Sequence, residues 1–132
     1  MSDIRPEMRY TEEHEWALLT AEGVIRVGIT DHAQCSLGDI VYVDLPSVGT
    51  PAAAFAPIGT IESVKTVSDL FSPVNGVIVN VNPALQSAPE LVNEQPYDAG
   101  WLIEIRPAGD SQEALKRLLS ADQYRSMLNI GP

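Results

Sequence analysis

One lysine stands apart from every other basic residue in the middle of the chain. The span from Asp39 to Glu104 contains eight acidic residues and a single Lys or Arg, which is Lys65. An amine becomes a Schiff-base nucleophile when burial or a neighbouring cation lowers its pKa, whereas Glu62 and Asp69 would favour the charged form. A lysine that receives a group after translation needs neither condition. We therefore interpret Lys65 as an attachment point, against the alternative of an ordinary surface lysine.

Two other chemistries fit the sequence less well. His32 and Cys35 are three residues apart on an expected helix, where a base and a thiol can meet. The sequence supplies neither the oxyanion hole nor the orienting third group that a cysteine nucleophile uses. The chain has only two histidines, so a metal site would have to join His14 and His32 to Glu13 or Glu15. We expect no catalytic residue and no bound metal.

The segment around Lys65 predicts how its amine is presented. Residues 58–64 and 77–81 are rich in β-branched side chains and are expected to be strands. The first strand ends near residue 64, which places Lys65 at or beside the following bend. Pro73 marks a pause in pairing because proline has no N–H to donate, and the Asn-Gly pair at 75–76 is a turn signal. Lys65 is therefore expected to project into water.

Short strands and turns account for the rest of the first hundred residues. Strands are expected over residues 10–20, 24–29, 39–45 and 101–105, with a loop over 47–57. Thr30 or Asp31 begins a short helix that stops at Gly38. Asn82 before Pro83 opens a helical turn, and residues 88–94 are expected to form another. This pattern predicts a mainly β fold, a small and partly open barrel or sandwich.

The C-terminal segment changes to a helical period. Asp110 or Ser111 caps a segment that places three leucines on one face, and residues 120–123 read as a capping box that opens a second helix. We expect helices over about 111–128 that cover an open end of the β core. Residues 1–8 are expected to be a flexible start, and residues 9–132 a single domain.

The bulk composition limits the function classes. A chain of 132 residues is long enough for one core, and no apolar run approaches the length of a membrane span. The net charge of −10 argues against nucleic acid and anionic membranes and suits basic patches on protein partners. The single cysteine excludes an internal disulfide framework. The N-terminus resembles neither a signal nor a transit peptide, so we expect a cytoplasmic protein.

Several segments, in order and spacing, resemble the glycine cleavage system H protein family. The hairpin match comprises Glu62, Ser63, Val64, Lys65 and Thr66, followed by Ser68-Asp69, Ser72-Pro73 and Asn75-Gly76. Further matches are Tyr10–Trp16, Val27–Gln34, Leu37–Pro46, Leu91–Asn93, Pro96-Tyr97 and Gly100-Trp101. The resemblance runs from about Arg9 to Leu128. The apolar segment 51–57 departs from the more polar, glycine-containing loop expected in relatives, which concerns loop shape and not the chemistry.

The resemblance implies a barrel-sandwich hybrid of two similar half-sheets, with short helices and a C-terminal helical segment. It implies lipoic acid bound covalently to Lys65 by a lipoate ligase or a lipoyl or octanoyl transferase. The arm would carry the aminomethyl group of glycine from a pyridoxal-phosphate glycine decarboxylase to a tetrahydrofolate-dependent aminomethyltransferase. A dihydrolipoyl dehydrogenase would then reoxidise it. The protein would be a monomeric carrier and not an enzyme.

The resemblance also implies a surface cleft that receives the loaded arm. Carboxylates of Glu13, Glu15 and Asp69 would bind the cationic amine by charge-assisted hydrogen bonds, and His32 would add a hydrogen bond or a shape contact. The alternative is that these are solvated or strand-end polar residues.

Four alternative functions stay open. A biotin carrier would be expected to flank its lysine with methionines, where this chain has Val64 and Thr66. A lipoyl domain of a 2-oxoacid dehydrogenase would lack the first strands and the terminal helices. An H-like lipoyl relay protein could keep every residue that carries the resemblance. The fourth alternative is an unmodified β interaction module that uses its acidic surface.

Overall fold

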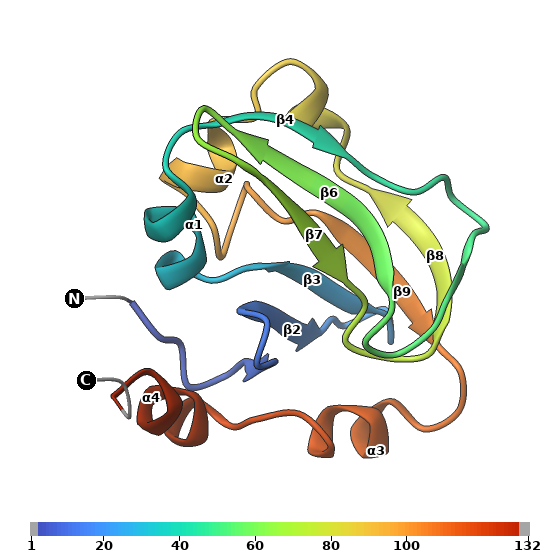
Figure 1. Ribbon diagram of the computed structural model, residues 1–132. Helices are drawn as coiled ribbons and strands as arrows, with labels where there is room; N and C mark the ends of the chain where they lie inside the picture. Colours follow the sequence, from blue (N-terminus) through green and yellow to red (C-terminus); the bar gives the residue numbers. More distant parts are fainter. Residues whose placement is uncertain (1–2, 130–132) are drawn as a thin grey trace.

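Two antiparallel sheets face each other across a common core in the computed structural model, which describes residues 3–129 (Figure 1). The larger sheet has six strands in the order β1-β2-β3-β9-β8-β5, and the smaller has three in the order β4-β6-β7. The larger sheet consists of β1 (Arg9–Tyr10), β2 (Glu15–Leu19), β3 (Ile25–Ile29), β9 (Ile103–Pro107), β8 (Gly76–Val81) and β5 (Pro51–Ala52). The smaller sheet consists of β4 (Ile40–Asp44), β6 (Pro57–Ser63) and β7 (Val67–Phe71). The mainly β sandwich predicted from the sequence is confirmed.

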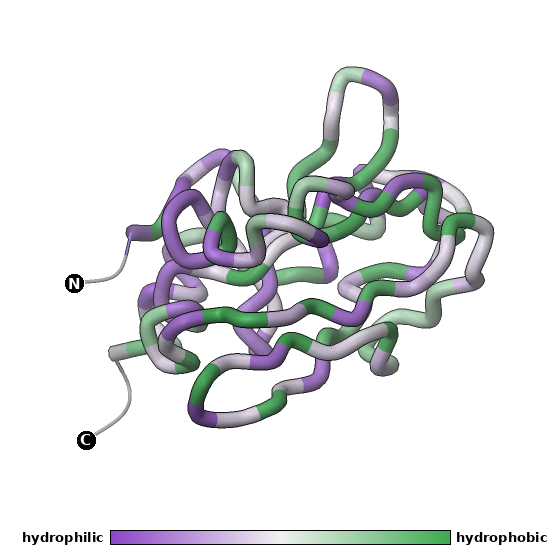
Figure 2. Tube along the Cα trace, turned by 90° about the horizontal axis from the view of Figure 1, so that it is seen from above, coloured by the Kyte–Doolittle hydropathy of each residue, from purple (hydrophilic) through white to green (hydrophobic). Residues whose placement is uncertain are grey.

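Alternation along the strands puts apolar residues between the sheets. Hydrophobic and hydrophilic residues follow each other along the chain trace (Figure 2), as the two-residue period of a half-buried strand requires. Ile61 of β6 and Leu70 of β7 are buried from one side, and Ile78 and Ile105 of the larger sheet from the other. All four belong to one cluster, so the smaller sheet has a fixed inner face and a fixed outer face.

The helices begin where the sequence predicts. Helix α1 (Asp31–Leu37) is capped by the Thr30 hydroxyl, which accepts from the N–H of Ala33, and ends at Gly38 with a φ of +84°. A positive φ is strained for residues with a Cβ, so glycine fits this end of the helix. The Asn82 side chain caps the 3₁₀ helix η1 (Pro83–Gln86). Helix α2 (Leu91–Glu94) follows within the expected 88–94 segment.

The two C-terminal helices lie on the β2 side of the larger sheet, away from the smaller sheet (Figure 1). They are α3 (Ser111–Lys116) and α4 (Ala121–Asn129). The predicted capping box is present, because the Gln123 N–H donates to the Ser120 hydroxyl while the Ser120 N–H donates to the Gln123 side chain. Tyr124 of α4 stacks on Tyr10 with ring centroids 4.6 Å apart. This stack joins α4 to the edge strand β1.

The described part of the N-terminal segment makes specific contacts. The N–H of Asp3 donates to the Asp31 carboxylate over 2.9 Å, and Met8 is buried beside the Tyr10–Tyr124 stack. Of the segment predicted to be flexible, residues 1–2 lie outside the described residues.

Three local predictions were wrong. The expected strand over residues 10–20 is broken by a turn at 11–14, after which β2 folds back on β1. The expected loop over 47–57 contains the short strand β5. The polar stretch between the strands expected over 58–64 and 77–81 was not predicted to contain a strand, but its residues 67–71 form β7. Their conformation comes from pairing with β6, which the local sequence pattern does not indicate.

The Asn-Gly pair at 75–76 also serves a different purpose from the predicted turn. The chain bends over residues 73–75, but Gly76 already belongs to β8 and pairs with Pro107. A Cβ at Gly76 would lie 2.2 Å from the backbone oxygen of Arg106. Glycine is therefore required here by the close approach of β9 and not by the turn.

Candidate functional site

Lys65 occupies the tip of the hairpin that joins β6 to β7. The strands pair from Pro57 and Phe71 up to Glu62 and Val67, and the N–H of Ser63 donates to the carbonyl oxygen of Thr66 over 2.8 Å. The tip is thus a tight four-residue turn in which Lys65 is the third residue.

Ser63 fixes the backbone on both sides of the lysine amide. Its buried hydroxyl oxygen accepts the N–H of Lys65 and the N–H of Thr66, each over 3.1 Å. A side-chain oxygen that satisfies backbone donors in this way is typical of serine in turns. The N–H of Val64 donates to the carbonyl oxygen of Asp39 over 3.0 Å. The tip is therefore tied to the segment between α1 and β4.

The lysine side chain is exposed and passes over the end of α1. A Cβ built on Gly38 would lie 3.2 Å from Cε of Lys65 and 3.8 Å from its Nζ. Across residues 3–129, the four ion pairs involve arginines and Lys116 but not Lys65. The amine thus projects from a rigid support, as the sequence predicts.

Glu15 is the most enclosed of the four residues predicted to line an arm cleft. The residue is 2% exposed, and its carboxylate accepts the Thr11 hydroxyl over 2.7 Å and the N–H of Phe71 over 3.1 Å. Burial raises the pKa of Glu15 to about 7, although both hydrogen bonds oppose that rise. Glu15 therefore links the 11–14 turn to the far end of β7.

The other three predicted residues lie on different elements. Asp69 is exposed on β7 and pairs with Thr60. His32, on α1, contacts His14 with ring centroids 4.8 Å apart. Nδ1 of His14 is 2.8 Å from the Tyr124 hydroxyl, so this histidine pair abuts helix α4. Burial lowers the pKa of His14, and the neighbouring His32 adds to the effect.

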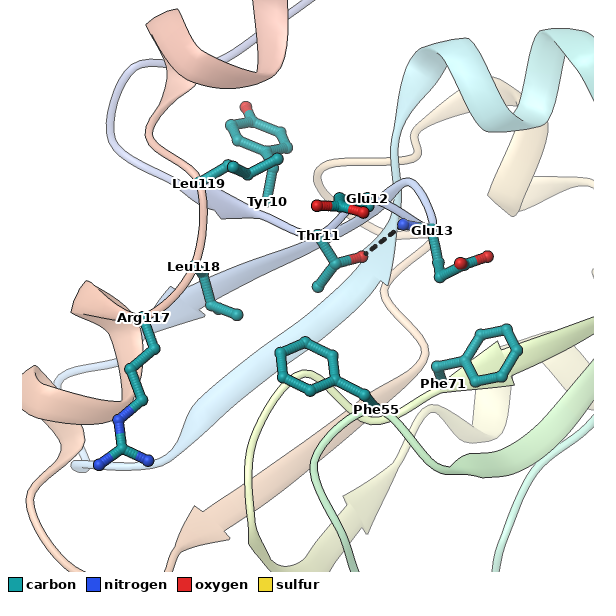
Figure 3. A pocket seen from close by; sticks show the side chains of 9 residues that line it. All are labelled: Tyr10, Thr11, Glu12, Glu13, Phe55, Phe71, Arg117, Leu118 and Leu119. Carbon is teal, nitrogen blue, oxygen red and sulfur yellow. Dashed lines mark hydrogen bonds between the residues drawn. The ribbon is translucent and has the colours of Figure 1, made fainter. Parts of the chain in front are cut away.

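Glu13 lies at the edge of a cavity beside the end of β7 (Figure 3). The cavity has a volume of about 360 Å³. It is lined by Tyr10, Thr11, Glu12, Glu13, Phe55, Phe71, Arg117, Leu118 and Leu119. The N–H of Glu13 donates to the Thr11 hydroxyl over 3.2 Å, which fixes the turn that carries it. Carboxylates therefore border a largely apolar hollow at the end of β7 opposite Lys65.

Some contributors were not predicted from the sequence. Gly38 lies under the Lys65 side chain, and Phe71 supplies the N–H that holds Glu15. Neither role has a local signal, because each depends on which segment packs opposite. Within residues 3–129 no group of three His, Cys, Asp or Glu side chains could hold a metal ion, and no described helix is long and apolar enough to cross a membrane.

Comparisons with known proteins give a consistent result. The family model described as "Glycine cleavage H-protein" matches residues 8–130. The chain is 52% identical over 125 residues to the glycine cleavage system H protein of Geobacillus kaustophilus, covering 95% of this chain and 96% of the relative. It is 50% identical over 129 residues to that of Mycolicibacterium smegmatis, covering 97% and 98%. Its fold is similar to the crystal structure of a glycine cleavage system H protein from Mycobacterium marinum, with a TM-score of 0.83, 40% identity and coverage of 96% and 99%.

Proposed function

Since the chain belongs to the glycine cleavage H-protein family, we propose that Lys65 is the residue that bears its lipoyl group. The protein is a lipoyl shuttle of the glycine cleavage system, and its fold is that of a lipoyl carrier. The observation that carries the proposal is the exposed Lys65 amine at the tip of a turn that Ser63 holds rigid.

The residues around Lys65 fit an amide-linked lipoyl group. The amine is accessible, and the backbone beside it is already hydrogen-bonded, so attachment requires no rearrangement of the hairpin. When bound, the lipoyl group supplies a disulfide that takes up a carbon group on sulfur and is restored by thiol–disulfide exchange. The hairpin contributes a fixed anchor, which gives each docked partner a high local concentration of the arm.

We propose the system's component enzymes as the partners. These are a glycine decarboxylase with pyridoxal phosphate, a tetrahydrofolate-dependent aminomethyltransferase and a dihydrolipoyl dehydrogenase. A lipoate ligase or a lipoyl or octanoyl transferase would attach the group. The net charge of −10 supports docking on basic surfaces of these proteins.

We further propose that carboxylates along β7 and at its end bind the amine of the aminomethyl cargo. A strand rises ~3.3 Å per residue, so Asp69 lies at most ~13 Å from Lys65 along β7. A lipoyl-lysine arm spans roughly 14 Å from Cα to its nearer sulfur atom, over about twelve bonds of ordinary length. Asp69 is therefore within reach, and the exposed Glu13 extends the acidic surface toward the cavity. Glu15, the third carboxylate predicted to bind the amine, is buried under Thr11 and Phe71 and does not belong to this surface.

Mass spectrometry of protein produced in a lipoate-supplied host tests the attachment site. We expect one lipoyl group, lost in Lys65→Arg and retained in Lys116→Arg. The second variant is the matched control, because Lys116 is the only other lysine and is also exposed. A biotin adduct on the wild type, or a lipoyl group on Lys116, would refute the proposal.

Decay of the aminomethyl-loaded protein tests the cleft. Asp69→Asn is expected to speed the release of the cargo several-fold without reducing lipoylation, because the amine loses a charge-assisted partner. Glu13→Gln is expected to act in the same direction. Glu90→Gln, on the loop before α2, is the control. Equal decay rates in wild type and in the first two variants would reject this assignment.

A further inference from the structure

The outer face of the smaller sheet carries an apolar patch next to Lys65. Seven large apolar side chains are exposed within the described part of the chain, and four of them lie at this end of the sheet. They are Val41, Tyr42, Val64 and Val67, which are 47%, 53%, 67% and 59% exposed. We call these four residues the Tyr42 patch. Single exposed apolar residues are ordinary, but a cluster of them beside a functional residue is typical of an interaction surface.

Strand register brings the patch together. Tyr42 of β4 pairs with Glu62 of β6, and Glu62 pairs with Val67 of β7. Neighbouring strands lie about 4.8 Å apart, so Tyr42 and Val67 stand about 10 Å from each other on either side of Glu62. Val64 belongs to the turn that joins β6 to β7. The patch therefore surrounds the base of the lysine-bearing tip.

A β-bulge in β4 enlarges the patch. The register between β4 and β6 shifts between Ile40 and Tyr42, which leaves Val41 as an extra residue. In a regular strand two successive side chains point to opposite faces, yet Val41 and Tyr42 are both exposed here. Bulges often turn a side chain toward a functional site.

Acidic side chains accompany the apolar ones. Glu62 lies in the row of the patch, and the next row consists of Asp44, Thr60 and Asp69, which pair across the same three strands. Apart from Lys65, the chain has no Lys or Arg between Asp39 and Glu104. The surface that fits this patch is therefore an apolar depression bordered by Arg or Lys side chains.

From this arrangement we infer that the Tyr42 patch docks the enzyme that acylates Lys65; the inference rests on the proposed function. The free lysine side chain extends only about 6 Å from its backbone, counted over five bonds, so the acylating active site must come up to the tip itself. A standard protein interface covers roughly 800 Å² on each partner, far more than the tip, and the Tyr42 patch is the exposed apolar surface that adjoins the tip. Enzymes that act on the end of the completed arm work roughly 14 Å from the backbone and need not cover this face.

The acylation itself balances with an activated lipoate. Nζ of Lys65 forms a bond to the carbonyl carbon of a lipoyl–adenosine monophosphate anhydride and loses a proton. The bond from that carbonyl to the phosphate oxygen breaks, and adenosine monophosphate leaves. The patch takes no part in this step and acts only on binding.

Steady-state lipoylation by a purified lipoate–protein ligase, with lipoate and Mg-ATP, tests the inference. Tyr42→Ser and Val67→Ser are each expected to raise KM for the carrier several-fold, and together by tenfold or more, with kcat and the denaturation midpoint little changed. Val48→Ser is the matched control. Val48 is 61% exposed but lies in the loop after β4, at the end of that strand away from the hairpin tip.

The possible outcomes distinguish failure of the docking inference from failure of the proposed function, which is lipoylation of Lys65. Wild-type protein that is not lipoylated at Lys65 contradicts the proposed function. Normal modification of the wild type, with KM unchanged in both patch variants, overturns the docking inference alone. It is overturned equally if the variants leave KM for the ligase unchanged and weaken only binding to the decarboxylase, the aminomethyltransferase or the dehydrogenase. A rise in KM confined to the patch variants, and absent in Val48→Ser, supports it.

Discussion

The buried carboxyl group of Glu15 should make the stability of this protein depend on pH in an unusual direction. Its pKa is raised from 4.5 to about 7 by burial. Between these two values the folded chain binds one more proton than the unfolded chain, so the free energy of unfolding decreases as pH rises. The stabilisation is fully present below pH 4.5 and is lost as pH passes through 7. Acidic groups with lowered pKa values behave in the opposite way.

The size of the effect follows from the shift. A change of roughly 2.5 pKa units corresponds to about 3 kcal/mol, at 1.36 kcal/mol per unit. From pH 5.5 to 8.5, well above the isoelectric point of about 4.4, the loss from this one group should be about 2 kcal/mol. Other carboxylates add their own pH dependence, so the informative quantity is the difference between wild type and a variant.

Glu15→Gln is the appropriate variant. A glutamine oxygen can still accept the N–H of Phe71, and its amide can donate to the Thr11 hydroxyl oxygen, so both contacts of the site survive in altered form. Chemical denaturation at pH 5.5 and 8.5 should give a variant about 2 kcal/mol less sensitive to this pH change than wild type. Glu13→Gln, the exposed neighbour, should retain nearly the wild-type dependence. If Glu15→Gln and wild type change in parallel, the protonation argument fails.

Three further outcomes are expected from substitutions in the hairpin and in the larger sheet. Ser63→Ala removes the acceptor of two backbone N–H groups at the tip, so it should lower the free energy of unfolding by about 1–2 kcal/mol and slow the lipoylation of Lys65; an unchanged rate would show that the tip needs no such support. Gly59→Ala places a Cβ against a backbone oxygen of β4 and should lower the free energy of unfolding by at least about 2 kcal/mol. Gly23→Ala has open space around it but a φ of +82°, so it should lower the free energy of unfolding by only about 1 kcal/mol, as measured by thermal denaturation. Trp16→Phe leaves a buried carbonyl oxygen without the indole N–H that it accepts over 2.8 Å, which should cost about 1–3 kcal/mol in denaturant titrations, and a cost near zero would contradict the account of that contact.

Local signals sufficed for the helix caps and for most strands. Thr30, Asn82, Asp110 and Ser120 cap the helices or turns that their side chains predict, because a cap depends on atoms two or three residues away. The exposure of Lys65 was also predictable, since a charged side chain at the bend after a strand projects into water. The strand β7 was not, because its residues gain their conformation by pairing with β6.

The sequence alone determined the mainly β kind of fold, because strand and turn signals are local. It also singled out Lys65, the only Lys or Arg between Asp39 and Glu104, as the residue for which attachment is proposed. Only the tertiary structure decided the states of the acidic side chains. Glu13 and Glu15 are two residues apart and chemically alike, yet one borders an open cavity and the other is sealed under Thr11 and Phe71 with a raised pKa. The physical reason is that desolvation depends on which distant segments cover a carboxylate, and the sequence around it does not encode that cover.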